Sequence, residues 1–230
     1  MAPSAPIVSE ARNDRDHERL TAPFATRRLI VRPAAEDDAA FIAGLWSDPR
    51  VTRFVGFPHG IPSALDDVPR RIRRGVGLTA LWVALDAAGR EPIGQCLLGA
   101  PDAEGVAEPD IKLAPAFWGQ GYGKELWAAI VDQVFLRSAC AAVRGTPNVA
   151  NVASIRMQKA AGMRRVGRGV SEFPVAMRAY AEPVTYYVYE LTRGEWLARR
   201  VSNAWPERDV GREPDGTKTS LTEKRHGLGR

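Results

Sequence analysis

The run Trp118-Gly119-Gln120-Gly121-Tyr122-Gly123-Lys124-Glu125 places three glycines at alternate positions, between a predicted strand at 109–113 and a predicted helix at 125–136. Glycine accepts positive φ and leaves room for a ligand to approach the main chain. A helix that begins here directs unpaired N–H groups and the positive end of its dipole at the loop. Because such an end binds anions, phosphate above all, the run predicts a site for a phosphorylated cofactor. The alternative is a tight turn without a ligand, but a turn needs fewer glycines.

Two common phosphate-binding motifs do not match this run. A Walker A loop requires Gly-x-x-x-x-Gly-Lys-Ser/Thr, whereas Trp118 stands at its first glycine and Glu125 at its hydroxyl position. A dinucleotide fingerprint requires Gly-x-Gly-x-x-Gly and an acidic residue after the next strand. Here the third glycine comes one residue early and the next predicted strand ends at Arg144. Nucleoside triphosphates and nicotinamide cofactors are therefore both disfavoured.

A second block, residues 148–163, is typical of a turn, a helix capped by Asn151 and a stop at Gly162. Together the two blocks resemble the GNAT N-acetyltransferases, in the RimJ/RimL-like branch that acetylates ribosomal-protein N-termini. The loop of that branch, Trp-Gly-x-Gly-Tyr-(Ala/Gly)-x-Glu, is complete here. Its helix pattern, Asn-x-x-Ser-Ile-x-x-x-x-Lys-x-Gly-(Phe/Met), lacks only the lysine, because Ala160 takes that position and Lys159 comes one residue earlier.

The resemblance extends beyond these two blocks. Residues 26–33 resemble the start of the branch and residues 191–196 its end, so the likeness covers about 26–197. Each motif alone is moderately specific, but four in the right order make a strong signal.

The order of the predicted elements indicates an α+β (mixed α/β) fold. Two apolar runs at 79–85 and 92–99 flank Asp86-Ala87-Ala88-Gly89-Arg90, which is a hairpin signal. The further predicted strands lie at 28–32, 107–113, 139–144, 164–172 and 184–191, and the further predicted helices at 36–47, 63–74 and 151–161. Hairpins combined with crossover helices imply a mixed sheet. The resemblance implies a GNAT-type fold, with a central, mostly antiparallel sheet, flanking helices and a splayed strand pair that holds acetyl-CoA.

The composition is that of one globular domain. The chain has 230 residues, of which 45% are hydrophobic and 26% charged, and no apolar run approaches the roughly 18 residues of a membrane span. We expect one N-acetyltransferase domain at 24–200, between disordered arms at 1–23 and 201–230. Because the start lacks a signal-peptide pattern, we expect a cytoplasmic protein without a membrane partner.

Charge and cysteine content narrow the function further. The net charge is +5, and the basic cluster Arg70-Arg71-Ile72-Arg73-Arg74 suits an acidic ligand such as coenzyme A or marks a solvated helix face. Nucleic acid is disfavoured as a partner, since no RNA-binding motif accompanies the cluster. Cys96 and Cys140 lie in apolar runs and are predicted to be buried free thiols. The histidines lie far apart, so the sequence predicts no metal site.

The resemblance implies acetyl-CoA as co-substrate and assigns its binding residues by matching position. The main chain of the loop holds the pyrophosphate, at Gly119, Gln120, Gly121, Tyr122, Gly123 and Lys124. The strand at Ile111, Lys112 and Leu113 bonds the pantetheine arm as an added β-strand would. Asn151 bonds the arm from the other side or serves only as a helix cap. Lys159, with Arg156 one turn away, meets the adenosine 3′-phosphate or only solvates the surface.

Attack of an amine on the thioester expels a thiolate, which requires a proton donor. Many family members supply a tyrosine at the position of Gln158, whereas the RimJ/RimL-like branch supplies a serine that matches Ser154. A serine that bonds back to a helix carbonyl is the alternative. Glu108 matches a glutamate of the branch and is the candidate base for the amine. Asp110, two residues later on the same predicted strand face, is a second candidate, and either carboxylate could instead pair with an arginine.

The resemblance implies that the acceptor is a primary amine, either a protein N-terminus or a small molecule. The family usually has Gly and an aromatic residue where Asp110 and Ile111 stand, which leaves the substrate class open. The segments 51–63 and 173–183 combine Phe, Pro and charge, as variable binding loops do. The predicted wall residues are Arg53, Phe54, Phe57 and His59, unless the two Phe rings pack into the core. A non-catalytic acyl-CoA sensor is the rival function, and a homodimer is left open.

Overall fold

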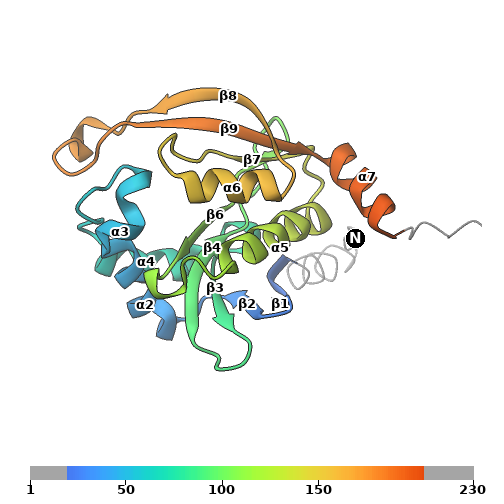
Figure 1. Cartoon of the computed structure of the whole chain (residues 1–230). Helices are drawn as coiled ribbons and strands as arrows, with labels where there is room; N and C mark the ends of the chain where they lie inside the picture. Colours follow the sequence, from blue (N-terminus) through green and yellow to red (C-terminus); the bar gives the residue numbers. More distant parts are fainter. Residues whose placement is uncertain (1–19, 205–230) are drawn as a thin grey trace, which may run out of the picture.

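In a computed structural model of the chain, residues 20–204 are described and form two β-sheets with helices around them (Figure 1). The first sheet is antiparallel, in the order β1 (Phe24–Ala25), β2 (Leu29–Pro33), β3 (Leu81–Asp86), β4 (Pro92–Leu97) and β6 (Asp110–Leu113). The second has the order β5 (Val106–Ala107), β7 (Ala142–Gly145), β9 (Val184–Thr192) and β8 (Arg164–Ser171), in which β5 and β7 run parallel. The parts of the predicted arms at 1–19 and 205–230 lie outside the described residues.

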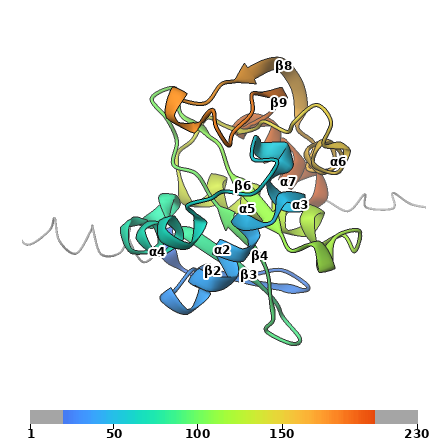
Figure 2. The ribbon, with the colours of Figure 1, turned by 90° about the vertical axis from the view of Figure 1, so that its left-hand side faces the viewer.

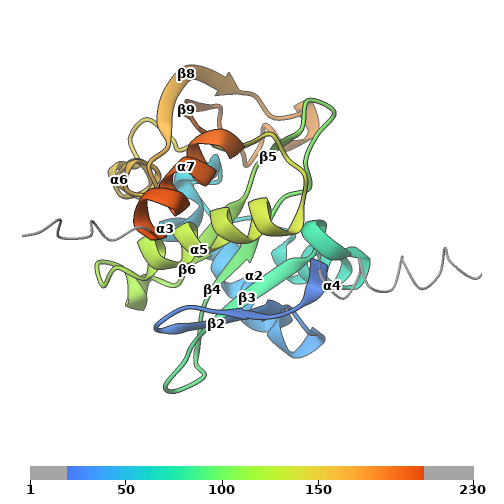
Figure 3. The same cartoon turned by 90° about the vertical axis from the view of Figure 1, so that its right-hand side faces the viewer.

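Helices cover both faces of the first sheet (Figures 2 and 3). The α-helices are α2 (Ala39–Ser47), α3 (Pro49–Thr52), α4 (Ala64–Arg74), α5 (Tyr122–Arg137), α6 (Val152–Ala160) and α7 (Arg193–Ala204). Short 3₁₀ turns are η1 (Glu36–Asp38), η2 (Arg53–Val55), η3 (Gly77–Thr79), η4 (Pro115–Phe117) and η5 (Val175–Met177). On one face, Trp46 of α2 and Val68 of α4 form a buried cluster with Leu81. On the other, Trp127 of α5 belongs to the main core with Trp82. Because both faces are covered, the first five residues of β3 are all buried.

The predicted α+β architecture is confirmed. The hairpin at 79–99 is present as β3 and β4, and the final strand pair as β8 and β9. The helix after the glycine run begins at Tyr122, three residues earlier than predicted, because Gly121 takes the N-cap position with φ of 82°. The loop itself therefore supplies the N-terminus of α5.

The predicted strand at 107–113 is divided in two. Its first part, β5, belongs to the second sheet and its last part, β6, to the first. Glu108 and Pro109 lie between them, outside both strands. Pro109 has no N–H to donate to a ladder, so continuous pairing is interrupted there. This break makes the chain change sheets.

The state of the cysteines and the character of the helices can also be compared with the sequence. Cys96 and Cys140 are free and buried, as predicted. Across residues 20–204, no helix has the length and apolar character required to cross a membrane.

Candidate functional site

The two sheets part beside β6. β5 pairs with β7 through Val106 and Ala107, but within the described chain β6 pairs only with β4. Beyond Pro109 the strands therefore diverge and leave one edge of β6 open. Ala114 N–H bonds to Ile93 O at 2.9 Å, so alternation turns the main-chain groups of Ile111 and Leu113 away from β4. This open edge can accept an extended chain of amide groups as an added strand.

The glycine loop follows β6 and leads directly into α5. Gly119 and Gly121 have φ of 75° and 82°, values that L side chains rarely adopt. Six consecutive main-chain N–H groups, from Gly119 to Lys124, donate to no acceptor within residues 20–204. We call these six groups the N–H cradle. Six free donors at a helix N-terminus suit an anion, and the binding of one at this loop stays a prediction.

The start of α5 also lies close to its neighbours. A Cβ on Gly123 would lie 3.4 Å from Leu113 Cδ1 and 3.7 Å from Met157 Sδ. Leu113 belongs to β6 and Met157 to α6. The absence of a side chain at Gly123 therefore lets the N–H cradle approach both the open strand edge and α6.

One face of α6 lies against the end of β7. Asn151 caps the helix, since its Oδ1 accepts from Ser154 N–H at 3.1 Å, so the cap prediction is confirmed. Ser154 and Gln158 follow on the same helical face. A Cβ on Gly145, the last residue of β7, would lie only 2.4 Å from Gln158 Oε1. Asn151 and Ser154 therefore face the strand that borders the gap between the sheets.

The Ser154 hydroxyl is available. The residue is half-buried, and its Oγ has no hydrogen-bond partner in the described part of the chain. The back-bonded serine that the sequence left as an alternative is therefore not observed. The Nδ2 of Asn151 is likewise without a partner among residues 20–204, so capping leaves that donor free for a ligand.

The two candidate bases are held by different cations. Glu108 Oε1 lies 3.8 Å from Arg144 Nη1, and Arg144 also bonds to Glu190 at 3.0 Å. Asp110 pairs with Lys112 on its own strand. The Glu108 side chain is 54% exposed and that of Asp110 is 40% exposed. A loosely paired, solvated carboxylate at the point where the strands diverge suits a base that acts through water.

Neither thiol suits a covalent acyl intermediate. Cys96 lies opposite Ile111 in the neighbouring strand, but it is fully buried, and burial raises the pKa of its thiol. A thiol in that state is not a nucleophile at neutral pH. Cys140 is buried as well. No group of three His, Cys, Asp or Glu side chains within 20–204 could hold a metal ion.

The two segments expected to bind the acceptor contact each other. The Phe57 ring centre lies 5.1 Å from that of Phe173 and 6.2 Å from that of Tyr180. Glu182 N–H donates to Gly56 O at 2.8 Å. Figure 1 shows the turn between β8 and β9 bent over the region of α3. Phe57 is only 8% exposed, so it joins the two segments instead of forming an open wall.

The remaining predicted contact residues lie nearer the surface. Arg53 and His59 are exposed, and the Arg53 guanidinium carbon lies 4.6 Å from the centre of the half-buried Phe54 ring. Lys159 and Arg156 are both exposed on α6. These positions are open to a ligand but carry no contact that selects one.

Sequence reasoning missed several residues of the site. Arg144 was considered only as the end of a strand, although it connects Glu108 with Glu190. Phe173 and Tyr180 lie inside the segment 173–183, which the sequence predicts to be a binding loop without singling out either residue. No local pattern indicates these contacts, because each joins segments that are distant in the sequence. Arg28 also contacts the glycine loop, and this residue belongs to the motif at 26–33 that resembles the start of the family branch.

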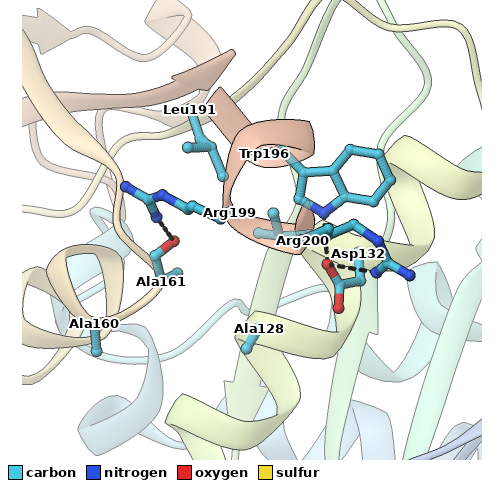
Figure 4. A pocket seen from close by; sticks show the side chains of 9 residues that line it. Ala128, Asp132, Ala160, Ala161, Leu191, Trp196, Arg199 and Arg200 are labelled. Carbon is cyan, nitrogen blue, oxygen red and sulfur yellow. Dashed lines mark hydrogen bonds and ion pairs between the residues drawn. The ribbon is translucent and has the colours of Figure 1, made fainter. Parts of the chain in front are cut away.

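A hollow of about 520 Å³ lies away from this site, between α5, α6, β9 and α7 (Figure 4). Its polar groups bond to one another or to the main chain. Trp196 Nε1 donates to Asp132 at 2.6 Å, and Arg200 lies 3.8 Å from the same carboxylate. Arg199 donates to Ala161 O and Gly162 O. This arrangement ties α7 to α5 and α6.

Comparison with known proteins agrees with this geometry. A family model described as "Acetyltransferase (GNAT) domain" matches residues 28–164. No curated protein matches the sequence.

Solved structures share the fold at low sequence identity. A spermidine N-acetyltransferase from Vibrio cholerae, in complex with CoA and spermine, is 18% identical with a TM-score of 0.61, over 75% of this chain and 99% of that chain. A ribosomal-protein-S5-alanine acetyltransferase from Vibrio fischeri is 15% identical with a TM-score of 0.62, over 76% and 98%. An aminoglycoside acetyltransferase in complex with coenzyme A is 21% identical with a TM-score of 0.56, over 75% and 99%.

Proposed function

The chain belongs to the GNAT acetyltransferase family, and we propose that it transfers the acetyl group of acetyl-CoA to a primary amine by direct attack on the thioester. The observation that carries this proposal is the open edge of β6, which leads into the N–H cradle. An extended arm with amide groups suits the edge, and a pyrophosphate suits the cradle. Acetyl-CoA carries both groups on one molecule, in that order.

The donor residues follow from this placement. The N–H groups of Gly119 to Lys124 hold the pyrophosphate, and the main-chain groups of Ile111 and Leu113 bond the pantetheine arm. Asn151 Nδ2, which its capping role leaves free, bonds the arm from α6. Lys159 remains a candidate for the 3′-phosphate, since it is exposed on the same helix.

The amine loses one proton to Glu108, directly or through a water molecule, with Asp110 as the second candidate base. Glu108 is favoured because its pairing with Arg144 is long, whereas Asp110 is engaged by Lys112. An α-amine needs only a modest base. Its pKa of about 7.7–8.0 lies roughly 2.5 units below that of a lysine, a difference of about 3–4 kcal/mol in the free energy of deprotonation.

The departing sulfur takes its proton from Ser154. The amine nitrogen bonds to the carbonyl carbon, the C–S bond breaks, and Ser154 Oγ–H protonates the thiolate and is itself reprotonated from solvent. An acceptor that starts as an ammonium becomes neutral by giving its first proton to Glu108. The nitrogen then loses a second proton to solvent as the amide forms, and this second proton balances the one that the thiol gains. The free hydroxyl of Ser154, on the α6 face that lies against β7, supports this role.

The acceptor is a protein N-terminus or a small amine. The complete loop motif of the RimJ/RimL-like branch favours a protein N-terminus as the first acceptor to test. The structural neighbours do not choose between the classes, because their own names cover spermidine, a ribosomal-protein alanine and aminoglycosides. A cytoplasmic location, a homodimer and the domain boundaries at 24 and 200 stay predictions.

The rival proposal is an acyl-CoA sensor without turnover. It shares the N–H cradle and the strand edge and differs only in the residues near the acceptor. The free Ser154 hydroxyl favours the enzyme, because a sensor needs no proton donor there.

Thiol release from acetyl-CoA, measured against a panel of peptides with different N-termini and small amines, tests this function. We expect acceptor-dependent release that falls at least about tenfold in Ser154→Ala, the low end of what losing an acid catalyst costs. Ser171→Ala, at the exposed end of β8, is the matched control and should keep full activity. Coenzyme A binding without turnover on any amine would contradict the enzyme and favour the sensor.

A further inference from the structure

The residue that precedes β2 contacts the glycine loop, across a separation of 97 positions in the sequence. Arg28 Nε donates to Glu125 Oε2 at 2.7 Å, and Arg28 N–H donates to Glu125 Oε1 at 2.8 Å. Arg28 Nη1 donates to Gln120 O at 3.0 Å, and the guanidinium carbon lies 4.2 Å from the centre of the Tyr122 ring. Thr26 Oγ1 adds a bond of 2.6 Å to Glu125. One arginine therefore contacts three residues of the loop and the start of α5.

The bond to Gln120 O fixes the direction of the next N–H group. In a trans peptide the C=O of one residue and the N–H of the following residue point to opposite sides. Arg28 holds Gln120 O on its own side, so Gly121 N–H is directed away from the arginine. A Cβ on Gly121 would lie 3.5 Å from Arg28 Nη2, which shows how closely the guanidinium lies beside this peptide. Gly121 N–H is one of the free donors of the N–H cradle.

Arg28 also offsets a charge that opposes anion binding. The Glu125 carboxylate lies in the first turn of α5, where it would repel a phosphate. Burial alone would raise the pKa of Glu125, but the bonds from Thr26 and Arg28 outweigh it and leave this pKa below its ordinary value. Glu125 is therefore charged at neutral pH. The two side chains are 32% and 19% exposed, so solvent screens their pairing only in part.

We propose that Arg28 is a positioning residue for the pyrophosphate of acetyl-CoA. It holds the Gln120–Gly121 peptide with its N–H turned toward the ligand, and it neutralises Glu125 beside the ligand. Arg28 touches no reacting atom. The inference rests on the proposed function for the identity of the ligand, and its test separates the two.

The test compares a ligand that has the pyrophosphate with one that lacks it. The variants are Arg28→Ala and Arg28→Lys, with Arg27→Ala as the matched control, because Arg27 is exposed and makes no contact with the loop in the described structure. Coenzyme A binding is measured by calorimetry. Turnover is measured with acetyl-CoA and with S-acetylpantetheine, which ends before the pyrophosphate.

We expect Arg28→Ala to weaken coenzyme A binding at least about tenfold, the effect of losing a hydrogen bond to a charged group. The kcat/KM for acetyl-CoA should fall by the same factor, while that for S-acetylpantetheine stays within about twofold. Arg28→Lys should lose part of this preference, since an ammonium keeps the charge but cannot bond Glu125 and Gln120 together as the guanidinium fork does. Arg27→Ala should match the wild type.

Three results would overturn the inference. Equal losses with both thioesters in Arg28→Ala would show that the arginine only supports the fold. A similar loss in Arg27→Ala would show that general positive charge is responsible. Full activity in Arg28→Lys would contradict the role of the Arg28 guanidinium in orienting the Gln120–Gly121 peptide. A wild-type protein that binds coenzyme A, turns over neither thioester and still loses coenzyme A affinity in Arg28→Ala would uphold the inference while contradicting the proposed function.

Discussion

The donor end and the acceptor end of the site are built differently. The donor end consists of the N–H cradle and the open edge of β6, and its ligand groups are main-chain atoms that two left-handed glycines and a helix start put in place. The proposed acceptor end consists of the segments 51–63 and 173–183, which side chains such as Phe57 and Phe173 hold together. A site made of main chain has a local sequence signature, whereas a site made of side-chain contacts between distant segments has none.

The strongest test of this contrast is Gly121→Val. Gly121 has φ of 82°, where an L side chain costs about 1–2 kcal/mol and a branched one more, so the loop should relax out of the cradle conformation. Each binding event must then restore the cradle conformation, and the free-energy cost of doing so weakens binding. The KM for acetyl-CoA should rise roughly 10- to 30-fold, because about 1.4 kcal/mol corresponds to each factor of ten. Steady-state kinetics should show no change in the acceptor KM.

Gly194→Ala is the control for this substitution. Gly194 lies in α7 without positive φ and with nothing within 4 Å of an added Cβ, so both KM values should stay at the wild-type level. If Gly121→Val raised the two KM values equally, the donor and acceptor ends would be coupled and the contrast would fail.

A smaller effect, on the KM of the acceptor instead of acetyl-CoA, is expected from a substitution at the acceptor end. Phe173→Ala removes an aromatic pair with Phe57, and such a pair contributes about 0.5–1.5 kcal/mol beyond its burial. If the joined segments shape the acceptor site, the acceptor KM should rise roughly 2- to 10-fold, while the KM for acetyl-CoA stays constant. Val170→Ala, an exposed position on β8 outside the two segments, is the control. An unchanged acceptor KM in Phe173→Ala would show that these segments do not bind the acceptor.

The smallest effect should come from a residue outside both ends. Hydrogen bonds from the main chain and hydroxyl of Thr192, and from Arg164, lower the pKa of Glu195 to about 2. A carboxylate with a lowered pKa in the folded state stabilises the protein above its unfolded pKa, about 4.3, and this contribution is lost as pH falls toward 2. The Glu195→Gln variant should therefore have a lower Tm than the wild type at pH 7. This difference in Tm should shrink as pH falls from about 4.3 toward 2.

Both KM values should be unaffected in Glu195→Gln, because this carboxylate joins β8, β9 and α7 and does not contact either end of the site. A difference in Tm that is constant from pH 7 to pH 3 would contradict the assigned role of its charge.

Much of the fold could be predicted because its signals are short-range. The hairpin of β3 and β4, the helix capped by Asn151 and the pairing of β8 with β9 each depend on neighbours within one or two elements. The division of the strand at Pro109 was missed, although its signal was present. A proline that lacks an N–H interrupts pairing, but the sequence does not say that the chain then enters another sheet.

The candidate site divides in the same way. The N–H cradle lies where the sequence placed it, because φ at Gly119 and Gly121 and the helix start are local properties. Glu108 was predicted as the first candidate base and Asp110 as the second, on one strand face. The structure adds that Glu108 lies outside both strands and that the two carboxylates pair with different cations, Arg144 from β7 for Glu108 and Lys112 for Asp110.

The sequence by itself therefore determined the family, the α+β architecture and the conformation of the glycine loop at the start of α5. These follow from backbone conformation and from hydrogen bonds between residues close in the chain, which residue types specify directly. Only the tertiary structure decided which edge of β6 is open, that Arg28 supports the glycine loop, and that Phe57 joins Phe173 instead of forming a wall. The contacts of Arg28 and Phe57 join segments about 100 residues apart, and the open edge of β6 depends on which sheet each neighbouring strand enters. Such features arise from the packing of the whole chain.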